Sequence, residues 1–126
     1  MRRRSVRPEP LVALIAVVVF VVVLAACGGG GGGGPTKVVQ NGKIEVGAYD
    51  IRFDVKTIKA QPGPLTVTLV EHGSLNHTFK VLGKSFELKV GSGTDRESGT
   101  IDLKRGTYKF ECLIHPDMEG TVKVGG

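Results

Sequence analysis

Apolar and polar side chains alternate with a period of two along most of residues 36–126. Because successive side chains of a β-strand point to opposite faces, this period indicates strands that each bury one face. Clusters of Gly, Pro and Ser, such as those at 61–64 and 91–93, separate the alternating runs and are typical of tight turns. We therefore predict an all-β fold, an antiparallel Greek-key β-sandwich or barrel of about seven to eight short strands.

Composition limits the size of the fold and the classes of partner. The chain has 126 residues, of which 40% are hydrophobic and 23% are charged, which suits one small core and one folded domain. The length excludes a multidomain enzyme and a polytopic membrane protein. Of the formal net charge of +5, most lies in residues 1–26, which hold four arginines and one glutamate. The remainder has no basic stripe with interleaved aromatic residues, so we expect no nucleic-acid binding.

The first 26 residues look like an export signal. Their arginines precede a run of 16 residues without a polar side chain, from Leu11 to Ala26. A positive head, an apolar run and small residues at its end are typical of a signal peptide. The sequence Leu24-Ala25-Ala26-Cys27 resembles the lipobox of bacterial lipoproteins, which implies cleavage before Cys27 and lipidation of its thiol. The alternative is an uncleaved N-terminal anchor, and both interpretations place the rest of the chain outside the cytoplasm, attached to the cell membrane.

A glycine run separates this signal from the predicted domain. Seven consecutive glycines, residues 28–34, follow Cys27, and Pro35 ends the run. Such a segment behaves as a flexible tether that spans about 15 Å. We therefore divide the chain into a signal peptide with lipobox at 1–26, a lipidated Cys and glycine-rich tether at 27–35, and a domain at 36–126.

The residues with the most distinctive chemistry lie near the end of the domain. Cys112, His115 and Met118 follow an alternating run with the spacing Cys-x2-His-x2-Met, and His77 begins another predicted strand. Each residue alone is most often a core or surface residue. The occurrence of Cys112, His115 and Met118 within seven residues, and a Cys without a disulfide partner in an oxidising compartment, indicate a metal site.

Thiolate, imidazole and thioether groups are soft to borderline metal ligands. Two His and one Cys with a weak axial Met describe a blue-copper electron-transfer site, although zinc is chemically possible. His77 is the candidate for the second imidazole because its strand also offers apolar residues to the core. His72 lies in the turn-like sequence Glu71-His72-Gly73-Ser74, and we expect it to be an exposed turn residue.

The stretch from Tyr108 to Val122 resembles the C-terminal copper loop of the cupredoxins, the type 1 blue-copper proteins. Its spacing and its His-Pro-x-Met sequence are similar to those of amicyanins, whose loop is shorter than that of plastocyanins. The sequence Asn76-His77-Thr78-Phe79 is similar to the upstream His of this family and the strand that follows it. Thr78 stands where the family often has an Asn that supports the ligand loop.

The resemblance implies a cupredoxin-like sandwich that binds one type 1 copper ion and carries single electrons without substrate chemistry. It also implies the ligand atoms His77 Nδ1, Cys112 Sγ and His115 Nδ1, with Met118 Sδ in the axial position. Copper binding and delivery outside the cytoplasm is the alternative function, which the single Met of the mature chain argues against. A metal-free immunoglobulin-like adhesion module is a third hypothesis.

We expect the electron to leave through His115 to a redox protein partner. Weak electron-transfer partners dock on small apolar patches. The predicted docking surface is an apolar collar around the copper edge, formed by Leu75, Leu113, Ile114 and Pro116. A small domain without a long apolar surface stripe is expected to be a monomer.

Overall fold

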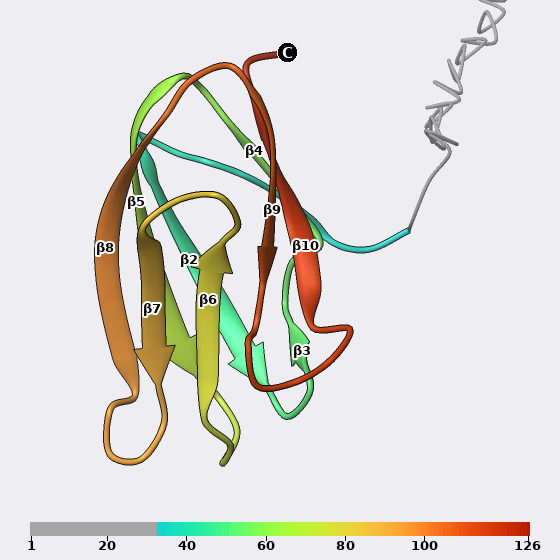
Figure 1. Ribbon diagram of the computed structural model, residues 1–126, viewed down its shortest axis with the longest axis vertical. Helices are drawn as coiled ribbons and strands as arrows, with labels where there is room; N and C mark the ends of the chain where they lie inside the picture. The colour runs from blue at the N-terminus through green and yellow to red at the C-terminus, as the bar shows by residue number, and fades with distance from the viewer. Residues whose placement is uncertain (1–32) are drawn as a thin grey trace, which may run out of the picture.

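The structure, a computed structural model, describes residues 33–126, and the predictions for 1–26 and for Cys27 lie outside this range. The described residues form ten strands and no helix (Figure 1), so none of them belongs to a helix able to cross a membrane. The strands are β1 (Thr36–Val38), β2 (Lys43–Tyr49), β3 (Arg52–Phe53), β4 (Thr57–Ala60), β5 (Gly63–Glu71), β6 (His77–Val81), β7 (Phe86–Val90), β8 (Arg96–Leu103), β9 (Gly106–Glu111) and β10 (Glu119–Val124).

Two sheets face each other in a sandwich, which confirms the predicted all-β class. One sheet has the order β1-β4-β10-β9-β6-β7 and the other has the order β3-β2-β5-β8. The prediction of antiparallel strands needs refinement, because β2 pairs with β5, and β4 pairs with β1 and β10, in parallel. The chain runs back through β4 in the opposite sheet before it enters β5, so β5 starts at the same end as β2. The two sheets are therefore mixed.

The core lies between the sheets, where the alternating apolar residues point inward. Its centre is a triangle of aromatic rings formed by Phe53, Phe79 and Phe110. Phe79 and Phe110 are stacked with ring centroids 4.6 Å apart, and Phe53 meets both rings edge-on. Aromatic contacts of this kind stabilise a core beyond the area that they bury. Because Phe110 precedes Cys112 by two residues, the same inward register that fills the core also carries the Cys inward.

Four loops meet at the end of the sandwich that is drawn lowest in Figure 1. We call this the loop end. Strand β5 ends there and β6 begins there, while β9 and β10 are joined there by residues 112–118. Because β6 and β9 are antiparallel neighbours, the first residues of β6 lie beside the residues that follow β9. The topology thus brings His77 next to the Cys112 segment.

Candidate metal centre

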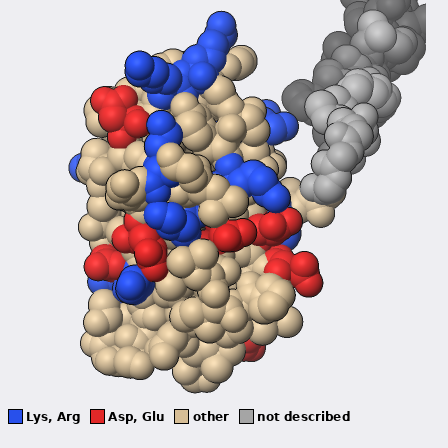
Figure 2. Space-filling model, in the orientation of Figure 1, with Lys and Arg blue, Asp and Glu red and all other residues tan. Residues whose placement is uncertain are grey.

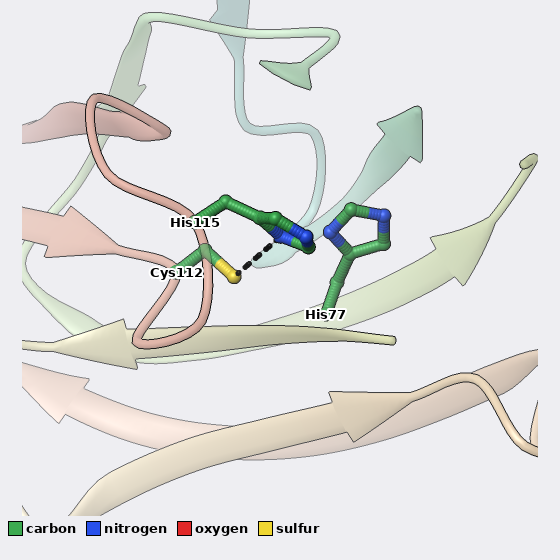
Figure 3. A group of neighbouring side chains, drawn as sticks. All are labelled: His77, Cys112 and His115. Carbon is green, nitrogen blue, oxygen red and sulfur yellow. Dashed lines mark hydrogen bonds between the residues drawn. The ribbon is translucent and has the colours of Figure 1, made fainter. Parts of the chain in front are cut away.

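Three of the four predicted ligands meet at the loop end. One potential ligand atom from each of His77, Cys112 and His115 lies within 4.8 Å of the others. His77 comes from the first position of β6, whereas Cys112 and His115 come from the loop between β9 and β10. Figure 3 shows one ring nitrogen of His77 pointing toward His115 and Cys112. Side chains from two distant parts of the sequence therefore enclose one small volume.

The loop 112–118 closes on itself. The backbone N–H of Cys112 donates to the carbonyl of Met118 at 2.8 Å, so the two ends of the loop remain in sheet-like contact. Asp117 adopts a positive φ of 66°, a conformation that tight turns often require. This turn buries Met118, whose exposed fraction is 2%, at the same end as the cluster. The spacing of the motif thus folds into one compact turn.

Thr78 holds the Cys112 segment in place. Its backbone N–H donates to Cys112 Sγ at 3.4 Å, and its side-chain oxygen accepts a hydrogen bond from the backbone N–H of Leu113 at 2.7 Å. Extending the β6–β9 register from Lys80↔Glu111 places Thr78 opposite Leu113. The Thr78 hydroxyl therefore accepts the hydrogen bond of the Leu113 N–H in place of a backbone carbonyl, at the point where the loop leaves the sheet. Sequence analysis left the role of Thr78 open, and the structure shows that it anchors the loop.

His77 is almost fully buried, with an exposed fraction of 1%. Burial lowers its pKa below the ordinary value, while the negative charge of Glu71 opposes this shift. A lowered pKa keeps the imidazole neutral at physiological pH, which is the form that can bind a metal ion. Among the described residues, neither ring nitrogen of His77 has a hydrogen-bond partner of good geometry. Buried imidazole nitrogens normally have such partners, so this ring is arranged for another contact.

The donor set suits a borderline or soft metal ion. Cys112 is the one free cysteine in the described part of the chain, and its Sγ lies 3.6 Å from His115 Nδ1. Two imidazole nitrogens and a thiol, with a buried thioether in the same turn, are the ligand types of copper and zinc sites. The cluster therefore fits a metal ion on its own chemistry.

Comparison with known proteins agrees with this geometry. Residues 12–124 match the family model described as a cupredoxin-like domain. The chain belongs to the cupredoxin-like family. No curated protein sequence matches it.

Solved cupredoxin structures are similar to the chain. A reduced amicyanin variant has 26% identity over 69% of this chain and 86% of its own, with a TM-score of 0.53. The Cu(I) form of another amicyanin variant has 25% identity over the same shares of both chains, also with a TM-score of 0.53. Reduced auracyanin from the photosynthetic bacterium Roseiflexus castenholzii shares the fold, with 18% identity over 68% of this chain and 98% of its own and a TM-score of 0.59. Cupredoxin structures thus include copper-loaded ones.

The other predicted site residues of this cupredoxin-like chain lie on its surface. His72 is exposed, as predicted, and stacks on Tyr49 with ring centroids 4.8 Å apart; it does not belong to the group formed by His77, Cys112 and His115. The proposed collar is also exposed, with fractions of 38% for Leu75, 54% for Leu113 and 51% for Ile114, and with Pro116 beside them. His115 itself is half-buried.

Sequence analysis missed one charged residue at the cluster. Glu71 Oε2 lies 3.3 Å from His77 Nε2, and the Glu71 side chain is only 6% exposed. A signal for it exists in the sequence, because Glu71 continues the inward-facing series Leu65, Val67 and Leu69 of β5. An acidic residue at an inward register position is unusual and indicates a specific partner.

Proposed function

We propose that this protein is a type 1 copper protein that carries single electrons outside the cytoplasm, held at the membrane by a lipid anchor. The observation that carries the proposal is the convergence of His77, Cys112 and His115 from two segments at one end of a cupredoxin-like sandwich. A copper ion bound there supplies a reversible one-electron redox couple. His77, Cys112 and His115 would hold this ion, and the Met118 thioether would be a fourth, weaker donor.

The chain's own contribution is a rigid frame for the ligands. Thr78 holds the Cys112 sulfur and the start of the loop, and the Cys112–Met118 backbone hydrogen bond closes the loop. Two buried rings of the aromatic triangle, Phe79 and Phe110, each lie two residues along the chain from one of these ligands. Ligands fixed in this way move little when the charge of the metal changes, so the reorganisation that opposes electron transfer is small. Cys112 and Met118 are buried, which keeps water away from their sulfur atoms.

The loop end supports docking of a redox protein. The collar residues Leu75, Leu113, Ile114 and Pro116 expose apolar surface around the half-buried His115. Figure 2 shows charged side chains across the middle and the upper end of the visible face, whereas the loop end is almost free of them. An uncharged apolar surface of small area suits brief encounters that must also dissociate.

Membrane attachment follows from the predicted lipobox. Lipidation of Cys27 would hold the domain near the membrane through the glycine tether 28–34. A monomer on such a tether can turn its loop end toward a donor and then toward an acceptor. Metabolic labelling with a palmitate analogue, with Cys27→Ser as the control, tests this part: a labelled Cys27→Ser variant would contradict it.

The central experiment adds Cu(II) to the fragment 33–126, which contains every strand described above, and records its visible spectrum. An intense thiolate-to-copper band is expected in the parent protein and is expected to be absent in Cys112→Ser. Copper delivery, the alternative function, requires ready exchange of the ion. The burial of His77, Cys112 and Met118 argues for slow exchange, so a Cu(I) chelator that removes the ion within seconds would favour delivery instead.

A further inference from the structure

We propose that Glu71 is a positioning residue for the metal centre. Its carboxylate holds the His77 ring through Nε2, and its negative charge lowers the reduction potential of the bound ion. This inference rests on the proposed function for its redox part, but its geometric part concerns only residues of this chain. It starts from a contact between two buried side chains, Glu71 Oε2 and His77 Nε2, which lie 3.3 Å apart.

Within residues 33–126 the two atoms have no alternative hydrogen-bond partners. Among the described residues, Glu71 Oε2 and His77 Nε2 form no hydrogen bond with any other group, and their side chains are 6% and 0% exposed. A carboxylate oxygen and an imidazole nitrogen left without partners in a protein interior would each cost stability. Their proximity is therefore best explained by an interaction between them that tightens when the imidazole binds a metal ion.

The backbone fixes the position of Glu71. It is the last residue of β5, where its N–H donates to the carbonyl of Asp95 at 2.8 Å and where it pairs in register with Ala48 of β2. Its other carboxylate oxygen, Oε1, accepts a hydrogen bond from the backbone N–H of Gly73. With one oxygen held by the turn, the second oxygen is directed at the His77 ring. The sheet opposite the ligand loop thus reaches into the metal site through this side chain.

The imidazole ring relates the contact to metal binding. Its two nitrogens point in different directions, so Nε2 near Glu71 leaves Nδ1 for the cluster. Figure 3 shows a ring nitrogen of His77 directed at His115 and Cys112. Nδ1 can bind a metal ion only when its lone pair is free, which in the neutral ring requires the proton on Nε2. A carboxylate beside Nε2 stabilises that tautomer and the orientation of the ring.

The charge of Glu71 has a further consequence for the redox couple. A buried negative charge near the metal stabilises the state with the higher positive charge more than the other state, because charges interact strongly where water is excluded. The oxidised ion is therefore favoured over the reduced ion. Removing this charge without changing the shape of the side chain is expected to raise the reduction potential.

The test compares Glu71→Gln and Glu71→Ala with Glu45→Gln, which removes an equal charge from an exposed position on the neighbouring strand β2. In the metal-free protein, nitrogen NMR of the imidazole groups is expected to show the His77 proton on Nε2. In Glu71→Ala the tautomers are expected to mix. This measurement needs no copper, so it separates failure of the inference from failure of the proposed function. A wild-type proton on Nδ1 would overturn the inference.

The second measurement is the midpoint potential of the copper-loaded proteins. Glu71→Gln is expected to change the ratio of Cu(II) to Cu(I) affinity by roughly tenfold in favour of Cu(I), a rise of about 59 mV for a one-electron couple. Glu45→Gln is expected to shift the potential by much less. Equal shifts in the two variants, or a lower potential in Glu71→Gln, would overturn the electrostatic role. If Glu71→Gln does not fold, the tautomer of wild-type His77 still decides the geometric part.

Discussion

The two imidazoles of the candidate metal centre are held in different ways. His77 is the first residue of a strand, pairs in register with Val90 and is 1% exposed. His115 belongs to a loop, is half-buried, and has the exposed Leu113 and Ile114 as neighbours. The strand-held imidazole is shielded from solvent, whereas the loop-held imidazole is partly exposed at the surface. We therefore propose that the strand side of the site sets the geometry and that the loop side gives the electron its path to the surface.

The largest effect is expected from removing each imidazole in turn. His77→Gly and His115→Gly should both lose the blue band of the copper-loaded protein. Added imidazole should restore the band in His115→Gly at a much lower concentration, because the space left by a surface residue is open to solvent. Titration with imidazole, followed in the visible spectrum, measures this. If both variants needed the same imidazole concentration to recover the band, the sites left by His77 and His115 would be equally open to solvent.

The anchoring of the loop to the strand can be tested through Thr78. Thr78→Val keeps the shape but removes the acceptor for the Leu113 N–H, and should lower the free energy of unfolding of the metal-free protein by about 2 kcal/mol. The matched control is Thr68→Val, which removes an exposed hydroxyl that bonds Ser98 at 2.7 Å, and should cost less than about 0.5 kcal/mol. Urea unfolding compares them, and similar losses would mean that Thr78 has no special role in holding the loop.

If the apolar collar around His115 is the docking surface, a charge introduced there should slow electron exchange. Electron self-exchange between two copies of the protein is measurable by NMR in mixtures of the oxidised and reduced forms, and it needs no known partner. Ile114→Lys should slow it about tenfold, because a charge must then lose water in an apolar contact. Val38→Lys, at a residue 58% exposed on β1, should change the rate less than about twofold. An unchanged rate in Ile114→Lys would remove the collar from the docking surface.

The smallest expected effect concerns pH and the buried imidazole. Because burial lowers the pKa of His77 in the folded state from 6.5, the unfolded chain binds a proton more readily. The free energy of unfolding of the metal-free protein should therefore fall as the pH drops from above 6.5 toward the lowered pKa. The slope is at most about 1.4 kcal/mol per pH unit for one proton. Urea unfolding at several pH values measures it, and an equal slope in His77→Gln would assign the effect to other groups.

Much of the fold and the site could be predicted before the structure was considered. The period of two in segments such as Ile44–Ala48 and Leu65–Leu69 identifies strands, because side-chain direction along a strand is a local property. It does not predict that β2 and β5 run in parallel, since that depends on which sheet the chain enters between them. The order of strands is therefore a long-range property, and the sequence pattern is silent on it.

The site shows the same division between local and long-range information. The spacing from Cys112 to Met118 predicts a single ligand loop, because few conformations of so short a segment bring its side chains together. The choice of His77, the anchoring by Thr78 and the approach of Glu71 depend on contacts between residues far apart in the chain. A carboxylate at an inward position could have drawn attention to Glu71, but it does not name the partner.

Sequence alone thus determined the type of fold and the kinds of ligand atom, because alternation and short spacing act within a few residues. The tertiary structure decided how those atoms meet. The β6–β9 register sets His77 and Thr78 against the Cys112 segment, and β5 ends where Glu71 can reach the ring of His77. Thr78 and Leu113 are 35 residues apart, and the pairing of β6 with β9 within one sheet brings them together. Glu71 belongs to the other sheet, so the packing of the two sheets brings it to His77.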